Sequence, residues 1–70
     1  MTTYPTTTTP ADRATARRIA RELGAEATSS DQRIDLAAFA DRCRAADVHP
    51  RCISDDVAAA EFVAGRDGAL

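Results

Sequence analysis

The feature that most constrains the fold is an amphipathic stretch in the middle of the chain, residues 34–48. Its apolar side chains recur at the i, i+3, i+4, i+7 spacing of one helical stripe; they are Leu36, Phe39, Ala40 and Cys43. Asp35 is a natural N-cap, because its carboxylate can accept hydrogen bonds from the free amides of a first turn. Ile34 and Phe39 then occupy the two positions of a hydrophobic staple. The stretch predicts a helix over 35–47, with a start at Ser30 as the alternative.

Two further helices are predicted on either side of it, over residues 11–23 and 54–64. Pro10 stands in the first turn of the earlier helix, where proline is tolerated, and Gly24 is expected to end that helix. Ser54 is the expected N-cap of the later helix, and Gly65 is expected to stop it. The predicted fold class is therefore all-α, a small bundle of three short helices.

A low-complexity, threonine-rich segment with two prolines, residues 1–10, precedes the helices. Both residue types disfavour helix, so this segment is expected to be an extended or disordered arm before a three-helix domain over 11–70. Tyr4 is its candidate anchor on a partner protein, and a tail without contacts is the alternative. Because sixteen residues are alanine, the core is thin, and such cores contribute only about 3–5 kcal/mol. A partner is expected to add stability.

The charge of the chain is small in sum but unevenly distributed. All nine basic residues are arginine and the net charge is −2, which argues against extensive phosphate binding. A coding-composition bias would also produce this arginine usage. Four arginines share one flank of the first predicted helix: Arg13, Arg17, Arg18 and Arg21. A solvated helix face is the ordinary interpretation of that flank, and a nucleic-acid contact is the alternative.

Several activities are disfavoured by the residue pattern. Cys43, His49 and Cys52 fall within ten residues, but their Cys-x₅-His-x₂-Cys spacing is not that of a structural zinc site, and Asp47 is the one nearby fourth ligand. A disulfide between the two cysteines is the other alternative. The scattered glycines form no phosphate-binding loop, and no pairing of nucleophile and base has an evident oxyanion hole. We therefore expect no metal, no cofactor and no catalysis.

The expected location of the protein is the cytoplasm. The first ten residues lack the basic and apolar regions of a secretory signal. No stretch approaches the roughly 20 apolar residues that a membrane span requires. In a reducing compartment Cys43 and Cys52 would remain unpaired thiols.

Two short stretches resemble known motifs. Residues 15–24, TARRIARELG, look like the first helix and turn of bacterial helix-turn-helix DNA-binding domains. Such domains continue with a short turn and a polar recognition helix, whereas this chain continues with a long polar connection and an acidic, alanine-rich helix. Residues 31–39, DQRIDLAAF, are similar to the exit of an EF-hand loop. The positions that need a glycine, a first acidic ligand and a final glutamate hold Gln32, Ala27 and Ala38. Neither stretch assigns a family.

The helix predicted over 54–64 carries the functional hypothesis, because it is apolar on nearly all sides. Phe62 and Val63 are expected to form the centre of a protein contact, and an exposed alanine face is the alternative. The full set of expected contact residues is Phe62, Val63, Ala59, Glu61, Arg66 and Tyr4. The sequence thus predicts a small non-catalytic interaction, regulatory or assembly module that binds a larger protein or itself. A DNA-binding module that uses the arginine flank is the alternative.

Overall fold

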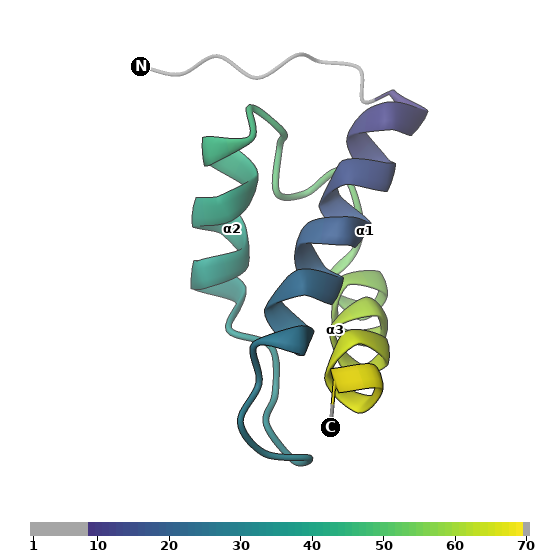
Figure 1. The fold of residues 1–70 in the computed structure, drawn as a ribbon. Helices are drawn as coiled ribbons and strands as arrows, with labels where there is room; N and C mark the ends of the chain where they lie inside the picture. Colours follow the sequence, from purple (N-terminus) through teal and green to yellow (C-terminus); the bar gives the residue numbers. More distant parts are fainter. Residues whose placement is uncertain (1–8, 70) are drawn as a thin grey trace.

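The structure, a computed structural model, describes residues 9–69 and is all-α within them (Figure 1). The chain forms three helices, α1 (Pro10–Ala25), α2 (Leu36–Ala45) and α3 (Asp55–Ala69). The predicted fold class is confirmed. The expected arm falls mostly on residues 1–8. These residues, which include Tyr4, lie outside the described part of the chain.

Each helix begins at a residue whose side chain caps it. Asp35 accepts hydrogen bonds from the amides of Ala37 and Ala38, at 3.0 and 3.3 Å, and Ser54 Oγ accepts from the Val57 amide at 3.2 Å. Both predicted caps are confirmed. The helix α1 begins with a capping box that the sequence analysis missed. Thr9 Oγ1 accepts from the Asp12 amide at 3.1 Å, and the Asp12 carboxylate accepts from the Thr9 amide at 3.4 Å.

The predicted ends of two helices are wrong. The helix α1 continues through Gly24 to Ala25, and α3 continues through Gly65 to Ala69. Neither glycine adopts the left-handed conformation that ends a helix, since no glycine among the described residues has a positive φ. Both glycines instead lie where α1 and α3 cross.

At this crossing each glycine faces the backbone of the opposite helix. A Cβ atom on Gly24 would overlap the Phe62 carbonyl oxygen and lie 2.8 Å from the Arg66 amide nitrogen. A Cβ atom on Gly65 would overlap the Arg21 carbonyl oxygen. The arrangement is reciprocal, because each glycine meets the carbonyl three residues before the other glycine. Glycine is needed at both positions because only hydrogen atoms fit between the two backbones.

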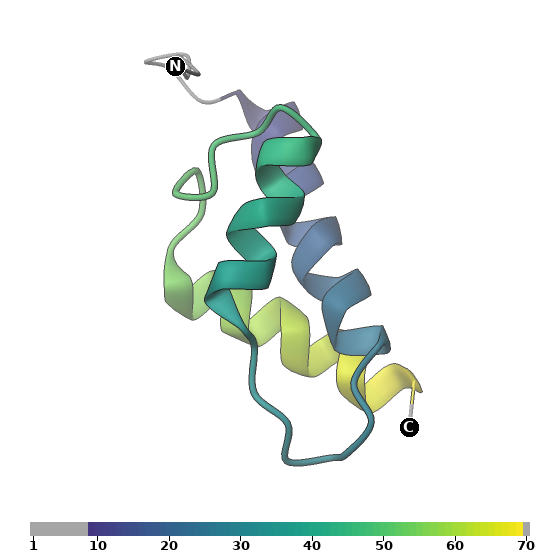
Figure 2. The same ribbon diagram turned by 90° about the vertical axis from the view of Figure 1, so that its left-hand side faces the viewer.

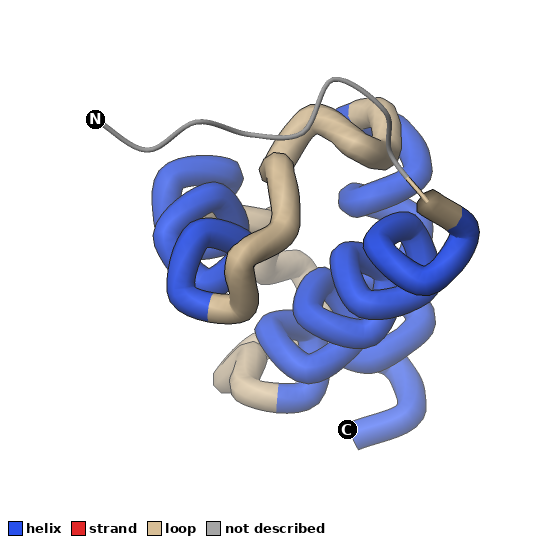
Figure 3. Tube along the Cα trace, turned by 90° about the horizontal axis from the view of Figure 1, so that it is seen from above, coloured by secondary structure: helices blue, strands red, loops and turns tan. Residues whose placement is uncertain are grey.

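The packing of the three helices is unequal. The helices α1 and α3 are in extensive contact, whereas α2 meets α1 at fewer positions and comes close to α3 at very few. Figure 2 shows α1 and α3 crossing, and Figures 1 and 3 show α2 to one side of them, between two long connections. The main core cluster draws from all three helices and the second connection: Ala16, Ile19, Ala20, Phe39, Cys43, Val48, Ile53 and Ala58.

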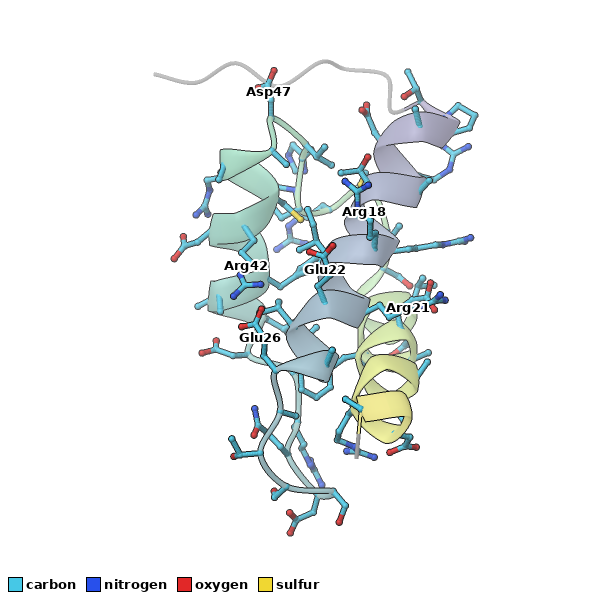
Figure 4. All side chains as sticks on the ribbon, in the orientation of Figure 1. Arg18, Arg21, Glu22, Glu26, Arg42 and Asp47 are labelled. Atoms are coloured by element: carbon cyan, nitrogen blue, oxygen red, sulfur yellow. The ribbon has the colours of Figure 1, made fainter. Side chains whose placement is uncertain are left out.

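The position of α2 exposes one residue that the helical stripe placed inside. Leu36 is 42% exposed, although Phe39 and Cys43 of the same stripe are buried. Because α3 barely reaches α2, nothing in the described chain fully covers that first turn. Across the other side of α2, Arg42 donates two hydrogen bonds to the Glu26 carboxylate, both at 2.6 Å (Figure 4). This guanidinium lowers the pKa of Glu26.

The end of α2 is set by Asp47, which has a φ of 60°. The Val48 amide donates to the Cys43 carbonyl at 2.8 Å, and the Asp47 amide donates to the Arg44 carbonyl at 3.0 Å. These two bonds define a Schellman motif, and the buried pair Cys43 and Val48 supplies its apolar contact. The stop therefore comes from a left-handed aspartate.

Replacing Asp47 with glycine is expected to stabilise the protein by about 0.5–1 kcal/mol. The left-handed conformation costs an L-residue roughly 1–2 kcal/mol, and the greater backbone freedom of glycine in the unfolded chain offsets about 0.5–1 kcal/mol of the gain. Asp41→Gly is the matched control, because Asp41 is exposed inside the same helix. Urea unfolding followed by circular dichroism should move in opposite directions for the two variants. Equal destabilisation by both would contradict the assignment.

Candidate functional site

In the structure, the predicted contact residues of α3 do not share one surface. Phe62 is 2% exposed and faces inward, while its neighbour Val63 is 38% exposed and faces solvent. The expectation that Phe62 lacks cover within the chain is therefore wrong. On a helix, residues i and i+4 share a face, so Phe62 lies beside the buried Ala58 rather than beside Val57, Ala60 and Ala64.

The two charged residues of the expected contact set, Glu61 and Arg66, bind within the chain. Glu61 accepts a hydrogen bond from Arg21 Nη2 of α1 at 3.0 Å, and its side chain is 20% exposed. Arg66 Nη1 donates to the Gln32 carbonyl at 2.8 Å, and Arg66 Nε lies 3.1 Å from the Asp67 carboxylate. Glu61 therefore points toward α1, and Arg66 links α3 to the segment between α1 and α2. Ala59 is partly buried.

The crossing of α1 and α3 instead creates a groove that joins residues from both predicted surfaces. Its larger part has a volume of about 360 Å³. The adjoining part has a volume of about 270 Å³ and shares Arg18 and Arg21 with the first. We call these two hollows the α1–α3 groove. Its lining residues are Ala14, Arg17, Arg18, Arg21, Glu22, Ala25, Glu61, Ala64, Gly65, Gly68 and Ala69.

The larger part of the groove is floored by small apolar residues and bounded by charge. Ala25 belongs to α1, and Ala64, Gly68 and Ala69 belong to α3. With no long side chain among them, a partner can approach the backbone of both helices closely. The sequence carried a faint signal for this floor, since small residues recur one helical turn apart at positions 64 and 68. Its partner across the groove, Ala25, was not identifiable without the crossing.

Three arginines of α1 line the groove and differ in the ion pairs that they make. Arg21 is paired with Glu61, and Arg18 Nε lies 3.8 Å from Glu22 Oε1, with both of the latter side chains largely exposed. Figure 4 shows Arg18 and Glu22 on the exposed side of α1 and Arg21 beside α3. Arg17 makes no ion pair with any residue in the range 9–69. The groove thus retains basic groups that can accept new carboxylate partners at little cost.

The connections between the helices are longer than the turn of a helix-turn-helix. Residues 26–35 join α1 to α2, and residues 46–54 join α2 to α3, whereas the motif needs a turn of roughly three or four residues. The likeness of residues 15–24 to that motif therefore does not extend to its geometry. Arg13 lies on the same helix as the groove arginines and is partly buried.

The cysteines and the histidine do not assemble a metal centre. Cys43 and Cys52 are not bonded to each other, and residues 9–69 contain no group of three His, Cys, Asp or Glu side chains that could hold a metal ion. Burial raises the pKa of the Cys43 thiol to about 11 and also raises that of Cys52. Cys52 Sγ donates a hydrogen bond to the Asp12 carbonyl at 3.7 Å. Both thiols are therefore weak nucleophiles near neutral pH.

These features define a small all-α protein whose shallow surface groove is lined by alanine, glycine and arginine. No family model, curated protein or solved structure matches the chain. None of the described helices combines the length and the hydropathy that crossing a bilayer demands.

Proposed function

We propose that this chain is a small non-catalytic interaction module that binds an acidic, helical segment of a larger protein in the α1–α3 groove. The observation that carries the proposal is the pairing of a small-residue floor with three arginines from one helix. Helix recognition commonly uses an apolar groove between two helices, with charged residues at its rim. No cofactor takes part in this function.

The floor favours a helical occupant because small residues allow close approach of two helix backbones. Ala25 of α1 and Ala64 of α3 both line the larger hollow. A partner helix seated there would place the carboxylates on its flanks near Arg17 and Arg18. Arginine suits such contacts because its planar guanidinium can bind a carboxylate through two parallel hydrogen bonds.

A cytoplasmic location accompanies the proposal. Its support is the pair of unbonded thiols, Cys43 and Cys52, since reduced cysteines are typical of reducing compartments.

Selection from a displayed library of random peptides tests the proposed function. We expect wild-type protein to enrich peptides with an apolar helical stripe and flanking Asp or Glu. Ala64→Glu should abolish binding of these peptides, because it adds bulk to the floor and repels acidic residues. Ala60→Glu is the matched control, since Ala60 is also exposed on α3 but does not line the groove. Circular dichroism should show equal helix content in both variants.

Three results would contradict this assignment. The library would yield no acidic, apolar family of peptides; or both glutamate variants would bind the selected peptides like wild type; or both would lose binding together. Duplex DNA serves as the competing ligand, because a nucleic-acid module would bind it through the same arginines. DNA binding that falls steeply with salt and is lost on replacing Arg17 and Arg18 would favour the DNA-binding alternative.

A further inference from the structure

A second hollow lies away from the α1–α3 groove, where α2 meets the start of α3. Its volume is about 250 Å³. Its apolar lining comes from Leu36, Phe39, Ala40 and Pro50, and its polar lining from Arg44, Arg51 and Asp55. We call it the Leu36 hollow. Phe39 closes its floor and is buried, whereas Leu36 on its wall is 42% exposed.

The arginines of the Leu36 hollow are available to an incoming carboxylate. Arg51 makes no side-chain ion pair within the described part of the chain. Arg44 pairs with Asp41 at 2.7 Å, but both side chains are more than half exposed, at 55% and 76%. Exchanging such a solvated ion pair for another costs little free energy. The hollow therefore combines an apolar wall with positive charge in excess of the single carboxylate of Asp55.

The outward face of α3 has the complementary character. Leu36 and Val63 are the large hydrophobic residues that residues 9–69 expose. Asp56, Ala60, Val63 and Asp67 recur at i, i+4, i+7 and i+11, which places them on one stripe, and all four are exposed. Val63 is thus a single branched apolar side chain between two aspartates. We call these four residues the Val63 stripe.

The Val63 stripe cannot enter the hollow of its own chain. Asp55 lines that hollow, and Val63 follows it by eight residues, a rise of about 12 Å along a straight helix. Both exposed apolar sites therefore remain open to solvent within one molecule. They differ in charge. Asp56 and Asp67 flank Val63, with Asp67 lying 3.1 Å from the largely buried Arg66, whereas two arginines and only one aspartate line the Leu36 hollow. One molecule therefore carries both halves of a complementary contact.

We propose that a second copy of this chain docks its Val63 stripe into the Leu36 hollow. Val63 lies against Leu36 and the Phe39 floor, and the stripe's aspartates face Arg44 and Arg51. The contact is head to tail, because it joins two different surfaces, so it generates rings or open chains of molecules. The area involved is small, which makes the association weak and concentration-dependent.

Analytical ultracentrifugation of the full chain over a range of concentrations tests this self-association. Wild-type protein should grow beyond the dimer as concentration rises, with less growth at high salt. Leu36→Asp and Val63→Asp should each remain monomeric, since each removes one half of the contact. Both positions are exposed, and an aspartate in the first turn of α2 is favourable to that helix, so both variants should keep wild-type helix content.

Mixing the two variants gives the decisive measurement. The Leu36→Asp molecule keeps an intact Val63 stripe, and the Val63→Asp molecule keeps an intact Leu36 hollow, so an equimolar mixture should form a dimer and nothing larger. Ala37→Asp is the matched control, because Ala37 is exposed beside Leu36 but does not line the hollow; it should associate like wild type. Wild-type protein that stays monomeric, or a mixture in which the two variants fail to pair, would overturn the proposal.

Discussion

Phe62→Ala is expected to lower the free energy of unfolding by about 3–5 kcal/mol, the typical cost of removing a buried phenylalanine side chain. Phe62 is 2% exposed, so the truncation leaves a cavity as well as losing apolar burial. A chain with so few large apolar residues has little reserve, because cores of this size supply only about 3–5 kcal/mol in total. We therefore expect the variant to be largely unfolded at room temperature, as measured by circular dichroism and urea titration.

The neighbouring residue provides the control for this prediction. Val63→Ala removes apolar atoms from a side chain that is 38% exposed, so it should cost less than about 1 kcal/mol, as for most surface substitutions. A wild-type melt for Phe62→Ala, or equal losses for the two variants, would show that Phe62 is not part of the core. Such a result would restore the sequence-based expectation that Phe62 faces a partner.

Gly65→Ala and Gly24→Ala are each expected to destabilise the protein by about 1–3 kcal/mol, the usual range for overpacking a close contact. An added Cβ atom would overlap a carbonyl oxygen of the opposite helix in both cases. Backbone atoms cannot move aside as the end of a side chain can, so α1 and α3 would have to separate along their crossing. Urea unfolding curves of the two variants measure the effect.

Gly68→Ala is the matched control, because nothing lies within 4 Å of a Cβ atom built at Gly68. The same replacement inside α3 should there stabilise the protein by about 0.5–1 kcal/mol, since alanine favours helix over glycine. The opposite signs at positions 65 and 68 separate crossing geometry from helix propensity. Stabilisation by alanine at all three glycines would contradict the tight crossing.

Local chemistry determined the helices themselves. Asp35 and Ser54 accept hydrogen bonds from first-turn amides in the structure as their types and positions predicted. The spacing of Phe39 and Cys43 placed both in the core, where both are buried. These predictions depended on residues a few positions apart, and so the sequence alone was sufficient for them.

Tertiary packing decided which face of α3 is buried and what the glycines do. An almost entirely apolar helix gives no hydrophobic stripe to orient it, so the spacing allowed Ala60 and Ala64 inward as readily as Ala58 and Phe62. From the sequence alone, Gly65 was equally consistent with the end of the helix and with a position inside it. The crossing resolved both questions together: Gly65 meets the α1 backbone at Arg21, and with that face fixed Phe62 turns inward while Ala64 is left beside the groove. Such contacts join residues some forty positions apart, as Arg21 and Glu61 are, and no local pattern encodes them.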